Sequence, residues 1–185
     1  FSRITYKAEI DTLIKQGYLA PLISRAANFQ MDPTKANIKI VAGEYVARAL
    51  AESFDNTQIT NRICKELIGY KDSRKAWLLF AIDIEHAEHI AEQLDKNCIN
   101  ACYVHSRMKG DERDEIIRLF KRGMFQALVN VAVLTTGFDF PGIDLVALLR
   151  PTRSPVLHVQ MIGRGSRPAP DKENCLVLDF AGNLQ

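Results

Sequence analysis

Two arginines three residues apart, Arg164 and Arg167, are the side chains in this sequence best suited to bind an anion. Residues at this spacing project from one side of a helical turn, so the two guanidinium groups are expected to point the same way. Each guanidinium can bond phosphate oxygens bidentately, and two that converge on one spot suit a triphosphate. The alternative is a solvated basic turn. Gly163 and Gly165 weaken that alternative, because glycine lowers helix stability and lets a ligand approach the backbone closely.

A second polar segment, residues 134–142, lies about twenty positions before the arginines. Thr136 can donate to a phosphate oxygen, and Asp139 can accept from a sugar hydroxyl. Gly137 allows the backbone to come close to a ligand. The alternative is a polar turn made rigid by Pro141, and the segment alone leaves both interpretations open.

Buried strands alternate with amphipathic helices from residue 76 onward, and two further helical patterns fall between residues 45 and 68. This alternation predicts an α/β fold, a parallel sheet with helices on both faces. Ligands of such sheets bind beyond the carboxyl ends of the strands, so we expect both polar segments to lie there. Strands are expected at 76–82, 99–104, 126–131, 145–149 and 175–180, and helices at 84–94, 111–121 and 155–163.

Residues 1–40 differ from the rest and are interpreted as a connecting arm, so the compact domain is expected at 41–185. The arm begins with a short helix ended by Gly17 and continues as an extended segment over 19–29, broken at Asp32-Pro33. The chain begins with Phe1 rather than Met, so we expect it to be a piece of a longer polypeptide.

The composition, 47% apolar with a net charge of +2, allows a sizeable core and neither requires nor excludes a nucleic-acid partner. Any cationic surface must therefore be local. No apolar run is long enough to span a bilayer, and no membrane partner is expected. The spacing of the four cysteines matches no zinc knuckle, which indicates reduced thiols, no metal site and a cytoplasmic location.

Residues 83–86 (Asp-Ile-Glu-His) imitate an acidic magnesium-binding motif, but Ile84 separates the two carboxylates and begins an apolar helical stripe. Asp83 is instead predicted to cap the helix, with His86 and His89 on its solvated side. Trp77 and Phe80 are expected to pack in the core, with base stacking as the alternative. No Gly-x-x-x-x-Gly-Lys-Ser/Thr phosphate loop occurs in the sequence.

The two polar segments, taken in order, resemble motifs V and VI of superfamily-two helicases, with TTGFDFP at 135–141 and QMIGRGSR at 160–167. Phe80 resembles the end of motif IV, and His105-Ser106 resembles the segment between motifs IV and V. The likeness covers 76–182 and is closer to RadD-like bacterial DNA-repair helicases, through VNVAVLTTGFDFPGIDLVALLRPT, QMIGRGSRPAP, CLVLDFAGN and AEHIAEQL. Many RNA-acting relatives carry His-Arg in place of Gln160-Met161, which favours a DNA-directed member.

This resemblance implies the second RecA-like lobe, the helicase C-terminal domain, of an ATP-dependent DNA helicase with a role in DNA repair. ATP and Mg²⁺ would be held mainly by an N-terminal RecA-like lobe of the same polypeptide, and the DNA would be single-stranded or forked. Arg164 and Arg167 would reach the γ-phosphate, and Gln160 would couple the nucleotide to the DNA strand. The nucleotide would also contact Gly137, Asp139 and Gly163, and the DNA would contact Thr135, Thr136, Phe80, His105 and Ser106.

Two other functions fit the same motifs. The first is a non-catalytic RecA-like module on which nucleic acid or protein docks. The second is a translocase subunit of a restriction system, or a chromatin-type remodeller. A phosphate loop and an acidic magnesium motif encoded upstream of Phe1 would support the motor, and their absence would support the module.

The isolated chain is expected to hydrolyse no ATP and to bind single-stranded DNA weakly, because the phosphate cradle and half of the DNA track belong to the other lobe. Binding measured by fluorescence anisotropy at physiological salt checks this expectation, since such contacts weaken as salt rises. A sub-micromolar dissociation constant would contradict it.

Overall fold

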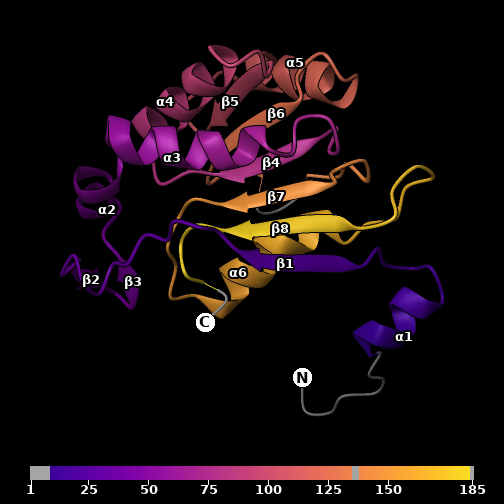
Figure 1. Cartoon of the computed structure of the whole chain (residues 1–185), viewed down its shortest axis with the longest axis horizontal. Coiled ribbons are helices and arrows are strands. Elements are labelled where there is room, and N and C mark those ends of the chain that lie inside the picture. Colours follow the sequence, from indigo (N-terminus) through magenta and orange to yellow (C-terminus); the bar gives the residue numbers. More distant parts are fainter. Residues whose placement is uncertain (1–8, 135–137, 184–185) are drawn as a thin grey trace.

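A parallel six-stranded sheet, in the order β1-β8-β7-β4-β6-β5, forms the centre of the computed structural model, which describes residues 9–134 and 138–183 (Figure 1). The predicted α/β fold is confirmed, and each predicted strand is present with its ends shifted by at most two residues. The strands are β1 (Leu22–Ala26), β4 (Trp77–Phe80), β5 (Ala101–His105), β6 (Ala127–Val131), β7 (Leu145–Leu148) and β8 (Cys175–Asp179).

Helices cover both faces of the sheet, because alternate residues of each strand point to opposite faces. Trp77 and Leu79 of β4 pack with α2, α3 and α4, whereas Leu78 and Phe80 pack with α5 and α6. All four side chains are buried, which confirms core packing for Trp77 and Phe80. The helices are α1 (Ile10–Lys15), α2 (Ala47–Phe54), α3 (Thr57–Ile68), α4 (Ile84–Asp95), α5 (Gly110–Lys121) and α6 (Pro155–Ile162).

The segment assigned to a connecting arm enters the sheet, which differs from the sequence-based interpretation. Residues 22–26 are extended, as expected, but they form the edge strand β1 in parallel register with β8. Just before β1, the Ala20 amide donates to the carbonyl of Ser166 (2.7 Å), and Pro21 accepts from the Cys175 amide (2.9 Å). The side chains of β1 are mostly exposed, so its place in the sheet depends on backbone bonds that hydrophobic patterning does not reveal.

A short hairpin, β2 (Ile40–Val41) and β3 (Glu44–Tyr45), links this segment to α2. Glu44 accepts hydrogen bonds from the Thr152 hydroxyl (2.5 Å) and the Arg153 amide (2.9 Å). Both partners lie between β7 and α6, so the hairpin is fixed to the loop that leads into α6.

The start of α4 confirms one prediction and corrects another. The Asp83 side chain caps the helix by accepting from the His86 amide (3.0 Å). His86, expected on the solvated side, is 0% exposed, and its Nδ1 accepts from the Ile82 amide (3.3 Å). Burial lowers the pKa of His86, which favours its neutral form. His89 is exposed, as predicted, and its hydrogen bond to Asp55 raises the pKa of His89.

No helix among the described residues is long and apolar enough to cross a membrane. The four cysteines are free thiols, and burial raises the pKa of Cys64, Cys102 and Cys175 to about 12. Those three thiols are therefore protonated at neutral pH and chemically unreactive.

The end of β6 has an unusual backbone. Asn130 is fully buried, and its Oδ1 accepts from the amides of Val133 (3.1 Å) and Leu134 (2.9 Å). These bonds turn the chain sharply through Ala132, which adopts a left-handed φ of 56°. The turn leads directly into the polar segment at 134–142.

Replacing Ala132 with glycine is expected to stabilise the chain by about 0.5–1 kcal/mol. The left-handed conformation costs an L-residue roughly 1–2 kcal/mol, which exceeds the roughly 0.5–1 kcal/mol of extra chain entropy that glycine loses on folding. Urea unfolding measures the difference. Ala132→Val is the matched control and should destabilise, because a β-branched side chain tolerates this φ least. A loss of stability in Ala132→Gly would contradict the assigned backbone.

Candidate nucleotide and nucleic-acid site

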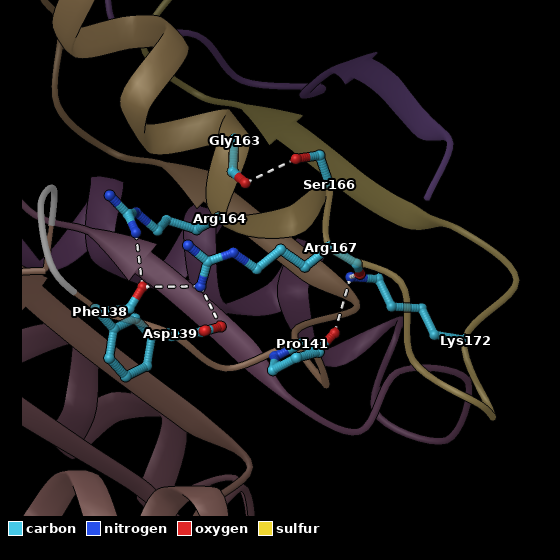
Figure 2. Close-up of polar contacts among 8 residues, drawn as sticks. All are labelled: Phe138, Asp139, Pro141, Gly163, Arg164, Ser166, Arg167 and Lys172. Atoms are coloured by element: carbon cyan, nitrogen blue, oxygen red, sulfur yellow. Dashed lines mark hydrogen bonds and ion pairs between the residues drawn. The ribbon is translucent and has the colours of Figure 1, made fainter. Parts of the chain in front are cut away.

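Arg164 and Arg167 converge on the polar segment, as their spacing predicted (Figure 2). Nη1 of Arg164 donates to the Phe138 carbonyl (2.6 Å), and Nη1 of Arg167 donates to the same oxygen (3.3 Å). Phe138 itself is buried in the core between the sheet and α5, so this oxygen has a fixed position. Two guanidinium groups from one turn therefore share one anchored acceptor.

Arg167 also forms an ion pair with Asp139, the residue expected at a ribose (Figure 2). Their side chains are 37% and 68% exposed, respectively. Such a pair contributes about 0–1 kcal/mol in water, so an incoming anion can exchange for the carboxylate at little cost. The ion pair of Arg167 with Asp139 is thus weak, whereas the Phe138 carbonyl that accepts from Arg167 has a fixed position.

The electrostatics of the pair favour an anion. Burial, followed by repulsion from Arg167, lowers the pKa of Arg164, and the charge of Asp139 offsets part of this effect. Arginine nevertheless stays protonated at physiological pH. The Phe138 carbonyl is neutral, and Asp139 is the described carboxylate that pairs with Arg167, so a phosphate group that exchanged for this carboxylate would bond both guanidinium groups.

The backbone that carries the arginines, residues 163–167, is called the arginine turn below. α6 begins with a cap from Ser154, which accepts from the Leu157 amide (3.2 Å), and ends in a 3₁₀ turn at Gly163–Gly165. The carbonyls of Gly165 and Arg167 accept from Nζ of Lys172 (2.7 and 2.8 Å), and the Ser166 carbonyl accepts from Ala20. Three consecutive carbonyls are thereby held from outside the turn.

Lys172 is a site residue that sequence reasoning missed. Besides its two bonds to the arginine turn, its Nζ donates to the Pro141 carbonyl (3.1 Å) in the polar segment (Figure 2). One ammonium group therefore joins the two predicted segments. A single lysine in a polar loop carries no spacing signal, so the sequence offered no means of finding it.

Gly165 fixes where the arginine turn lies. A Cβ atom at this residue would overlap Sγ of Cys175 and would lie 3.3 Å from Cγ2 of Val146. Cys175 is the first residue of β8 and Val146 the second of β7, so the turn rests on the beginnings of these strands. The expectation that both polar segments lie beyond the carboxyl ends is therefore wrong for the arginines. α6 runs back antiparallel to the strands, which carries its last residues toward their amino ends (Figure 1).

Three of the residues predicted to contact DNA, Phe80, His105 and Ser106, lie elsewhere, at or just after the carboxyl ends of β4 and β5. His105 ends β5, is partly exposed, and accepts at Nδ1 from the Arg107 amide (3.2 Å); Ser106 is exposed beside it. Phe80 ends β4 but is only 2% exposed, so its ring is not available for a base, which corrects that assignment. Thr135, Thr136 and Gly137 lie outside the described residues.

Gln160 is half-buried on α6, one turn before Arg164, and Gly163 is the first residue of the arginine turn. The described residues include no cluster of three or more His, Cys, Asp or Glu side chains that could hold a metal ion.

The sequence model of the helicase conserved C-terminal domain family matches residues 59–169. The chain belongs to this family. A Saccharomyces cerevisiae protein assigned as ATP-dependent helicase IRC3 is 32% identical over 182 residues, which cover 97% of this chain and 26% of that protein. This helicase lobe therefore spans about a quarter of the yeast relative.

Solved structures share the RecA-like fold of this lobe. A fragment assigned to the HsdR subunit of a type I restriction enzyme from Vibrio vulnificus has a TM-score of 0.67 and 23% identity, over 91% of this chain and 33% of that one. Mycobacterium smegmatis helicase Lhr, bound to single-stranded DNA and AMP-PNP, has a TM-score of 0.60 and 16% identity, over 88% and 20% of the two chains.

Gly165→Ala is expected to destabilise the lobe by about 1–3 kcal/mol, because the added methyl group overlaps Cys175 in a packed interior. Urea unfolding of the single variants and of Gly165→Ala/Cys175→Ala forms a double-mutant cycle. Removing the Cys175 sulfur should recover part of the loss. An equal loss in both backgrounds would show that the turn does not rest on β8.

Proposed function

We propose that this lobe is the second motor lobe of an ATP-dependent DNA helicase or translocase, and that Arg164 and Arg167 act on a nucleotide bound by the first lobe. The observation that carries the proposal is the convergence of both guanidinium groups on the Phe138 carbonyl from a turn whose backbone is held by other segments. Family membership makes ATP the appropriate anion.

The chemistry requires positive charge placed in advance. Negative charge develops on the phosphoryl oxygens during transfer, and donors that are already oriented stabilise it without reorganisation. The carbonyl that both arginines share keeps their orientation, and the weak pair with Asp139 leaves Arg167 able to bond phosphate. Gly163 belongs to the arginine turn and Asp139 pairs with Arg167, while Gln160 lies in the last turn of α6, directly before the arginine turn, which suits a role in coupling.

DNA would bind at the carboxyl ends of the strands. His105 and Ser106 are accessible there, and the polar segment that begins after β6 leads away from the same edge. Contacts of this kind go mainly to the phosphate backbone and are independent of sequence. The single-stranded DNA bound by Lhr supports DNA as the partner. ATP with Mg²⁺ would be held mainly by the first lobe. The role in DNA repair depends on the resemblance to RadD-like helicases alone.

A restriction translocase is the second candidate, and the likeness to the HsdR fragment favours it. Both candidates hydrolyse ATP, but only a helicase separates strands. A forked duplex and a triplex-displacement substrate, assayed with the full-length protein, distinguish them. A non-catalytic docking module would show no DNA-stimulated ATP turnover in either assay.

Arg164→Ala in the full-length protein is expected to lower the kcat of DNA-stimulated ATP hydrolysis by about 10³-fold or more, the usual effect of losing an arginine finger. ATP binding, measured with a fluorescent analogue, should largely persist, because the phosphate cradle lies in the other lobe. Arg48→Ala is the matched control, since Arg48 is an exposed residue of α2 that pairs only with Glu52 in the described structure. Turnover within a few-fold of the parent in Arg164→Ala would overturn the assignment.

A further inference from the structure

Lys172 lies in the loop between the arginine turn and β8, and its side chain is partly buried. Its ammonium group donates to three backbone carbonyls, those of Pro141 (3.1 Å), Gly165 (2.7 Å) and Arg167 (2.8 Å). An ammonium group has three N–H donors, so these bonds use all of them. All three donors of this partly buried ammonium group are therefore used in bonds within the protein.

The three acceptors come from both halves of the candidate site. Gly165 and Arg167 belong to the arginine turn, whereas Pro141 lies two residues after Asp139, the ion-pair partner of Arg167. The arginine side chains reach across the same gap in the opposite direction, to Phe138 and Asp139. Lys172 thus joins the backbones of the two segments, and the arginine side chains join the same segments through Phe138 and Asp139.

We propose that Lys172 is a positioning residue, whose ammonium group holds the arginine turn against residues 138–141 and so fixes the direction of both guanidinium groups. The inference rests on the proposed function for its effect on catalysis, but not for its effect on structure. The positive end of a lysine suits this place because no backbone amide could donate to three carbonyls that converge from two separate segments.

The electrostatic setting agrees with this role. Burial lowers the pKa of Lys172, and the charge of Asp144 acts in the opposite direction. The bonds to three carbonyls require the fully protonated amine, because a neutral amine has only two donors. Lys172 also adds a third positive charge to the arginine pair, which repulsion would drive apart if the backbone were not held.

The experiment compares Lys172→Met, Lys172→Arg and the control Lys96→Met in the full-length protein. Methionine keeps the length and apolar stem but has no donor, and Lys96 is an exposed lysine of the α4 end that pairs with Glu92. Two quantities are measured: kcat and KM for DNA-stimulated ATP hydrolysis, and hydrogen exchange of peptides that cover residues 138–144 and 163–167.

Lys172→Met should lower kcat about 10–100-fold, as expected for catalytic groups displaced by about 1 Å, with KM for ATP changed by a few-fold at most. Exchange should become faster in both peptides. Lys172→Arg should recover part of kcat, because a guanidinium group can still donate to at least two of the carbonyls, and Lys96→Met should match the parent.

Two results would overturn the proposal. If Lys172→Met keeps kcat near that of the parent while Arg164→Ala abolishes turnover, the proposed function stands and the positioning role fails. If hydrogen exchange is unchanged in both peptides, Lys172 does not join the two segments. This exchange result is independent of the turnover of Arg164→Ala, which tests the proposed function. Should the methionine variant not fold, Lys172→Gln, which keeps two donors, is judged by the same two criteria, with smaller effects expected.

Discussion

The Phe138 carbonyl accepts hydrogen bonds from both arginines, and the candidate site depends on this interaction. A neutral oxygen can bond two cations but cannot cancel their charge, so the pair keeps its mutual repulsion. That repulsion must be withstood by the backbone, and each fixing contact of the arginine turn serves this purpose. Gly165 lets the turn lie directly on β8, while Ala20 and Lys172 hold its carbonyls.

The result is a strongly cationic point on a nearly neutral protein. Arg164, Arg167 and Lys172 lie where the arginine turn meets residues 138–141. Nζ of Lys121 lies 5.4 Å from the centre of the Phe138 ring. Asp139 is the carboxylate that pairs with an arginine there in the described structure, and its side chain is more exposed than that of Arg167. The net charge of +2 therefore conceals a local field that suits a polyanion.

The sequence predicted what hydrophobic pattern and short-range chemistry control. Continuous apolar runs identified β4, β6, β7 and β8, and the Asp83 cap followed from the preference of helix ends for short acceptors. β1 escaped because its side chains are exposed and its place depends on backbone bonds to a strand about 150 residues away. His86 stands four residues before Ile90 on the buried face of α4, so its burial follows the helical period, but a polar side chain is usually expected to face solvent.

The convergence of the two arginines could be predicted from the sequence, but their place in the fold could not. The arginine spacing gave the convergence of the two side chains, whereas the general rule for parallel sheets placed them at the wrong end of the strands. The direction of α6 decides that position, and it is a property of the connection rather than of the residues. Lys172 could not be predicted, since its three partners meet only after the sheet has formed.

The entry of the chain at Ala20 has a mechanical consequence. The Ala20 amide bonds directly to the Ser166 carbonyl in the arginine turn. The chain then runs alongside β8, with which five residues of β1 are paired. Tension along the incoming chain acts parallel to these strands, so it loads several hydrogen bonds together in shear instead of peeling them one at a time. Traction from a preceding segment would therefore be felt first at Ser166, between the two arginines.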